Sequence, residues 1–166
     1  MMKSAVIDPT GKYRYLLRRI WGDQKTVLWV MLNPSTADAE EDDPTIRRCL
    51  GFTESLGYMA DGYGGLEVVN LFAVRSTDPK WLSRFQDPVG PENDDHIAKA
   101  AARAGKIIVA WGSHDKPFIT KRIAEVLLLL NGHTLYCLDL TNGAHPRHPL
   151  YCRSISKYPV WRKAGA

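Results

Sequence analysis

The 166-residue sequence is poor in cysteine, and its three cysteines form no recognisable pattern. Cys49, Cys137 and Cys152 are odd in number and widely spaced, which argues against a disulfide framework. There is no Cys-x-x-Cys pair that would indicate zinc or an iron–sulfur cluster. We therefore expect three small buried hydrophobic residues, and no metal or other cofactor.

Long apolar runs are also missing. Residues 126–130 form an apolar run, but it is far shorter than the roughly 20 residues of a membrane-spanning helix. The first ten residues contain Asp8 and Pro9 and lack the apolar stretch of a secretory signal. We therefore expect a cytoplasmic protein with no membrane partner. The sequence also lacks the P-loop, GxGxxG, HExxH and GxSxG signatures.

The charge balance is mildly basic, with a net charge of +4 and a pI near 9.0. Basic residues gather at 14–19, 47–48 and 147–163, whereas residues 40–43 are acidic. This balance is compatible with a polyanionic partner such as DNA or a nucleotide, although many basic proteins bind no nucleic acid.

Four short runs of mostly apolar residues predict the strands of a sheet: residues 27–32, 66–71, 106–111 and 134–138. They do not alternate with polar residues, which is typical of parallel strands covered on both faces. Residues 13–21 alternate loosely, as an edge strand or a hairpin arm would. Helical patterns follow at 44–56, with Asp43 as the N-cap, and at 93–104 and 116–130.

This order of elements predicts an α/β fold. We expect a three-layer α/β/α sandwich with a mainly parallel four-stranded central sheet and right-handed crossovers. The sequence contains no internal repeat and no linker-like segment, so residues 1–166 are interpreted as one domain with a core at about 25–155.

Polar residues gather at the carboxyl ends of all four predicted strands. Residues 33–36 follow the first strand and Asn70 lies near the end of the second, while residues 111–114 and 145–151 follow the third and fourth. Ligands bind beyond the carboxyl ends of the strands in such sheets. The four clusters therefore predict one binding crevice.

Several motifs, in this order, resemble DUF1643, an uncharacterised bacterial and phage family. The resemblance covers about residues 25–155 and rests on Leu-Asn-Pro-Ser-Thr-Ala-Asp (32–38), Asp-Pro-Thr-Ile-Arg-Arg-Cys (43–49), Val-Asn-Leu-Phe-Ala (69–73), Thr-Asp-Pro (77–79) and His-Pro-Leu-Tyr (148–151).

The same strand ends also resemble the uracil-DNA glycosylase superfamily. Residues 31–35, Met-Leu-Asn-Pro-Ser, are similar to its Gly-(Ile/Leu)-Asn-Pro motif, and residues 69–71 to its Leu-Leu-Asn. Residues 109–113 are similar to Leu-Leu-Trp-Gly-Ser, and its final His-Pro motif corresponds to either His145 or His148. The resemblance implies the strand order 2-1-3-4, with residues 27–32 as strand 1. It also implies hydrolysis of the N-glycosidic bond of a damaged or modified base in DNA.

That resemblance assigns roles to individual residues. Asn33 would orient the attacking water, and the Asn70 amide, with its donor and its acceptor, would read a pyrimidine edge. His148 would stabilise charge on the departing base. Leu150 or Tyr151 would fill the gap that a flipped base leaves in the duplex.

Further candidates lie between residues 35 and 47, after the first predicted strand. Ser35 occupies the position of that superfamily's stacking tyrosine, which makes it a substrate-binding candidate. A water could be oriented, or a metal held, by one of three acidic residues: Asp38, Asp42 and Asp43. A catalytic role of Asp43 is compatible with its role as a helix cap. Arg47 is a candidate for contact with phosphate. We also expect DNA binding to weaken with salt through four arginines: Arg47, Arg48, Arg147 and Arg153.

The sequence therefore predicts a DNA base-recognising, glycosylase-like hydrolase. Two alternatives stay open: a nucleotide or nucleoside hydrolase or transferase that uses the same pocket, and a non-catalytic base- or nucleotide-binding module. The base, the strand preference, the presence of activity and the oligomeric state are also open, and a monomer is compatible with the sequence.

Overall fold

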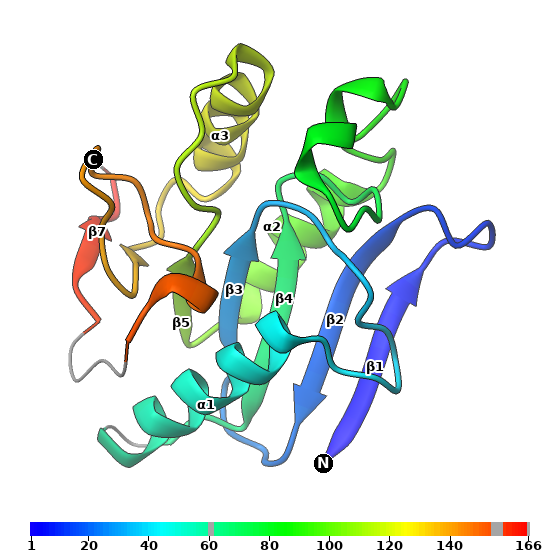
Figure 1. Ribbon diagram of the computed structural model, residues 1–166. Coiled ribbons are helices and arrows are strands. Elements are labelled where there is room, and N and C mark those ends of the chain that lie inside the picture. The colour runs from blue at the N-terminus through cyan, green and yellow to red at the C-terminus, as the bar shows by residue number, and fades with distance from the viewer. Residues whose placement is uncertain (60–61, 154–157, 166) are drawn as a thin grey trace.

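The computed structural model describes residues 1–59, 62–153 and 158–165 (Figure 1). Its strands are β1 (Met2–Ile7), β2 (Arg14–Ile20), β3 (Val27–Met31), β4 (Gly65–Asn70), β5 (Lys106–Val109), β6 (Leu135–Tyr136) and β7 (Val160–Arg162). Its α-helices are α1 (Pro44–Met59), α2 (Asn93–Arg103) and α3 (Pro117–Leu129), and two 3₁₀ helices are η1 (Pro79–Arg84) and η2 (Pro149–Tyr151).

The described strands form one mixed sheet in the order β1-β2-β4-β3-β5-β6-β7. The strands β4, β3, β5 and β6 are parallel neighbours. They correspond to the four predicted strands and confirm the predicted order 2-1-3-4.

The prediction of a mainly parallel four-stranded sheet is wrong, because antiparallel strands extend this parallel centre on both sides. β1 and β2 form a hairpin whose inner arm pairs with β4, and β7 pairs with β6. The hairpin interpretation of residues 13–21 is therefore confirmed, but this arm is not an edge strand. β1 and β7 lie at the edges instead.

Each face of the central sheet carries its own apolar cluster. Leu28 and Val30 of β3 pack in the cluster that includes residues of α2 and α3. Trp29, between them, points to the opposite cluster with residues of α1, and its indole N–H donates to Thr53 Oγ1 at 3.0 Å. Figure 1 shows the helices on both sides of the sheet. Because both faces are covered, the central strands carry no alternating polar residues.

The three predicted α-helices are present, with ends that differ by at most a few residues. The start of α1 is fixed by Asp43, whose Oδ1 accepts the Ile46 backbone N–H at 2.9 Å, which confirms the predicted N-cap. α1 follows β3 and leads into the parallel strand β4, so it begins at the carboxyl end of the sheet. This crossover brings the helix start to the predicted crevice.

The three cysteines are buried and free, as predicted. None of the helices in the described part of the chain combines the length and the apolar character that a bilayer crossing requires.

Candidate functional site

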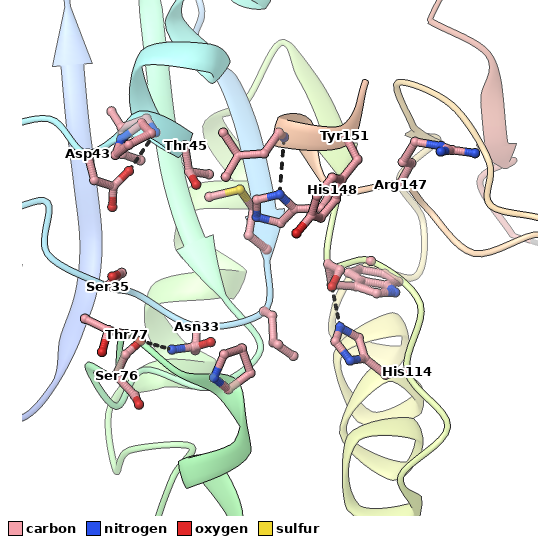
Figure 2. A pocket seen from close by; sticks show the side chains of 18 of the residues that line it. Asn33, Ser35, Asp43, Thr45, Ser76, Thr77, His114, Arg147, His148 and Tyr151 are labelled. Atoms are coloured by element: carbon pink, nitrogen blue, oxygen red, sulfur yellow. Dashed lines mark hydrogen bonds between the residues drawn. The ribbon is translucent and has the colours of Figure 1, made fainter. Parts of the chain in front are cut away.

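A cavity of about 690 Å³ lies at the carboxyl ends of the central strands (Figure 2). Its wall comes from the loop after β3, the start of α1, residues 76–79, the loop after β5 and the segment around η2. Small-molecule sites typically have volumes of about 300–1,000 Å³. The crevice predicted from the strand ends is therefore present and has the size of a small-molecule site.

Asn33 lines this cavity and ties two of its loops together. Its Nδ2 donates to the backbone oxygens of Pro34 at 3.0 Å and Ser76 at 2.8 Å. Both amide hydrogens are thereby used. The carbonyl Oδ1 forms no hydrogen bond within the described residues and is the side-chain atom left to orient a water or a ligand.

His148 faces the cavity from the other side, as Figure 2 shows. Its Nδ1 accepts the Leu150 backbone N–H at 3.2 Å. Burial lowers the pKa of His148, against an opposing influence of Asp43, and the imidazole is therefore neutral at pH 7. Because Nδ1 is the acceptor, we assign the proton of the neutral ring to Nε2, which is then a hydrogen-bond donor.

The choice between the two candidate histidines also follows from this geometry. His145 does not line the cavity, whereas His148 does. Of the two candidates, His148 is therefore the one retained for the site.

Asp43 completes the group of predicted catalytic residues. It lines the cavity at the start of α1, and its Oδ2 accepts the Ala37 backbone N–H at 3.4 Å. Its charge opposes the lowering of the His148 pKa by burial. The structure thus brings Asn33, Asp43 and His148 to one cavity. The other two acidic candidates are engaged elsewhere: Asp38 accepts backbone N–H groups, and Asp42 pairs with Lys3 and Arg19.

Asn70 does not line the cavity, so its predicted place beside the other two residues is wrong. It is the last residue of β4, paired with Met31, and its side chain is 1% exposed. β4 ends at Asn70 itself, so Asn70 is still a paired residue of the sheet and does not belong to the loop beyond it. Neither Oδ1 nor Nδ2 has a hydrogen-bond partner within the described residues.

Some of the predicted substrate-binding residues line the cavity and others do not. Ser35, Leu150 and Tyr151 line the cavity, and the last two are 47% and 74% exposed. Arg47 does not line it, and its guanidinium donates to the Asp42 backbone oxygen.

Sequence reasoning missed Arg14, a buried cation in the cavity wall. Arg14 is 2% exposed, and NH1 donates to the Ala37 backbone oxygen at 2.7 Å. Its Nε has no partner among the described residues. Burial lowers the pKa of Arg14 to about 10 against the opposing influence of Asp43, so the side chain is charged at pH 7. Arginine is almost never fully buried unless it is paired, so a buried arginine is a candidate functional residue. The sequence does not show that Arg14 is buried, and it therefore gave no signal.

The part of the chain that forms the site matches a known protein family. Residues 14–150 match the family model described as "Protein of unknown function (DUF1643)". The chain belongs to the DUF1643 family. The matched residues of this DUF1643 chain include Arg14, Asn33, Asp43 and His148. No curated protein and no solved structure matches the chain, so these comparisons give no support to the glycosylase resemblance.

The arginines that we expected to bind DNA phosphates in this DUF1643 chain are largely engaged within the protein. Arg48 donates to the Cys152 backbone oxygen and lies 4.5 Å from the centre of the Phe52 ring. Arg147 donates to Leu140 O at 3.0 Å and approaches Asp139 at 3.5 Å. Arg153 is exposed, and residues 154–157 of the same basic segment lie outside the described residues.

Proposed function

We propose that the cavity binds a nucleoside-type ligand and hydrolyses its N-glycosidic bond. The observation that carries this proposal is the meeting of Asn33, Asp43 and His148 at one cavity. Hydrolysis of this bond needs an acceptor that orients water at the sugar carbon, a base for the proton of that water and a donor at the departing nucleobase. These three side chains supply one group of each kind.

The reaction begins with a water held between Asn33 Oδ1 and the Asp43 carboxylate. Its oxygen forms a bond to the sugar C1′ while the bond from C1′ to the base nitrogen breaks. The Asp43 carboxylate accepts the proton that the water loses, a step that the Asn33 amide is unable to perform. The electron pair of the broken bond leaves with the base, where His148 Nε2–H stabilises it by a hydrogen bond.

A base within DNA is the second candidate substrate. Leu150 and Tyr151 favour it, because they are exposed apolar side chains in the cavity wall. Apolar side chains of this kind insert between base steps in proteins that distort DNA. The intramolecular contacts of Arg47, Arg48 and Arg147 do not favour it.

The test is a screen for base release. Nucleosides, nucleoside monophosphates, and single- and double-stranded oligonucleotides with modified bases are incubated with the protein. Free base is measured by chromatography and abasic sites by strand scission. We expect release from at least one substrate. Asn33→Ala and His148→Gln should each lower kcat by about a hundred- to a thousandfold with little change in binding.

His133→Gln is the matched control, since His133 does not line the cavity, and it should keep the wild-type rate. Full activity in both site variants would place the chemistry elsewhere. Binding without release of any base would identify a non-catalytic binding module.

A further inference from the structure

Two buried arginines of β2 differ in how completely they are paired. Arg19 Nε donates to Asp42 Oδ1 at 2.7 Å, and its other nitrogens donate to backbone oxygens that include Arg18 O at 2.8 Å and Asp38 O at 2.7 Å. This arrangement is that of a structural arginine, which holds the acidic loop before α1. The Arg14 side chain forms one hydrogen bond, to Ala37 O, and no ion pair with any described residue.

The unpaired donors of Arg14 belong to a side chain of the cavity wall. Its Nε is buried without a partner, and the guanidinium is charged at pH 7. Leaving a buried charged group without partners is strongly unfavourable. A group that stays charged and under-paired in a cavity is a candidate for binding a ligand of opposite charge.

The surroundings of Arg14 suit a tetrahedral anion. The hydroxyl groups of Ser35 and Thr45 line the same cavity and form no hydrogen bond within the described residues. The start of α1 contributes the partial positive charge of a helix N-terminus. Asp43 and Asp38 are the negative charges that act on Arg14, and both carboxylates accept backbone N–H groups: Asp43 from Ile46 and Ala37, Asp38 from Glu40 and Glu41.

We propose that Arg14 is the anion receptor of this cavity and that the ligand is a free nucleotide, whose phosphate monoester Arg14 binds. This inference rests on the proposed function for the nucleoside part of the ligand. It narrows the substrate class, because a phosphate bound by a buried guanidinium lies inside the cavity together with the base. In a polynucleotide the phosphates belong to a continuous backbone, which would have to enter the cavity together with the base. This placement of the phosphate therefore favours a free nucleotide over a polynucleotide.

The experiment measures binding by titration calorimetry, with thermal unfolding as a second readout. The probes are the four common nucleoside 5′-monophosphates, their nucleosides, inorganic phosphate, acetate and a single-stranded oligonucleotide. In the wild-type protein we expect a monophosphate to bind at least about tenfold more tightly than its nucleoside, as a charge-assisted hydrogen bond allows. Inorganic phosphate should compete with the monophosphate, and acetate should compete much more weakly.

Arg14→Gln should remove the preference for the monophosphate and leave the affinity for the nucleoside within about twofold, and Arg14→Lys should restore part of the preference. Arg84→Gln is the matched control, because Arg84 is exposed over the Trp81 ring outside the cavity. Should Arg14→Gln fail to fold, Arg147→Gln decides the question together with the competition by phosphate: Arg147 also lines the cavity, and its variant should keep the preference for the monophosphate.

Equal binding of nucleoside and monophosphate would overturn this inference, as would a preference that survives in Arg14→Gln. Tighter binding of the oligonucleotide than of every monophosphate, or no binding of any phosphate compound, would also overturn it. The proposed function fails separately: a phosphate preference that depends on Arg14, without release of base, leaves the anion receptor standing and removes the hydrolysis.

Discussion

Replacing Asn70 with leucine should stabilise the protein, although the change is made at a buried polar position. The Asn70 side chain is 1% exposed, and neither of its polar atoms has a hydrogen-bond partner within the described residues. An unsatisfied buried polar group costs about 1–3 kcal/mol, and leucine has the same branching at Cγ without polar atoms. We therefore expect Asn70→Leu to raise the free energy of unfolding by about 1–3 kcal/mol, or the melting temperature by about 2–4 °C per kcal/mol.

Asn93, the first residue of α2, provides the matched control, because its side chain contacts the end of the same strand. It is also buried, and its Oδ1 has no partner among the described residues, but its Nδ2 donates to Asn70 O at 2.9 Å and Leu71 O at 3.1 Å. Asn93→Leu removes these donors and should lower the free energy of unfolding by about 1–3 kcal/mol. Both variants are compared with wild type by urea denaturation followed by circular dichroism. A loss of more than about 1 kcal/mol in Asn70→Leu would show that the Asn70 amide is satisfied, and would refute the reasoning.

Two further predictions concern the catalytic candidates. Because burial lowers the pKa of His148 below its ordinary value of 6.5, the unfolded chain binds the proton more readily, and stability should fall as the pH decreases from 6.5 through the lowered pKa. Thermal unfolding at several pH values should show a smaller loss in His148→Gln, and an unchanged pH profile would contradict the buried neutral imidazole. Asp43→Ala removes the cap of α1 and should lower stability by about 0.5–2 kcal/mol, whereas Asp43→Asn should retain most of that stability. If Asp43→Asn also retains full base release, Asp43 is not the base.

The central sheet was predictable because its strands carry a strong local signal. β3 packs between two apolar layers, so every residue from Val27 to Met31 is apolar and buried. β1 and β7 carry no such signal. β1 is an edge strand with mixed burial, and β7 has three residues held by pairing with β6. Their place in the sheet depends on partners distant in sequence, which periodicity does not reveal.

The sequence allowed only those site residues to be predicted that directly follow the ends of the predicted strands. Asn33 and His148 follow strand ends and face the cavity. Asn70 was misplaced because a shift of one or two residues at the end of a strand decides whether a side chain stands beyond the sheet or within it. Arg14 was missed because the sequence shows a basic cluster, which usually means a solvated surface. Its burial arises only when the loop after β3 folds over it and Ala37 accepts its hydrogen bond.

The most direct test of the account is a crystal structure of the protein with the nucleoside monophosphate that binds most tightly. The account predicts density for the nucleotide in the cavity at the carboxyl ends of the central strands. The phosphate should lie within hydrogen-bond distance of the Arg14 guanidinium, and the base should lie against His148 Nε2. A nucleotide bound outside this cavity, or bound inside it with its phosphate remote from Arg14 and its base remote from His148, would contradict the account.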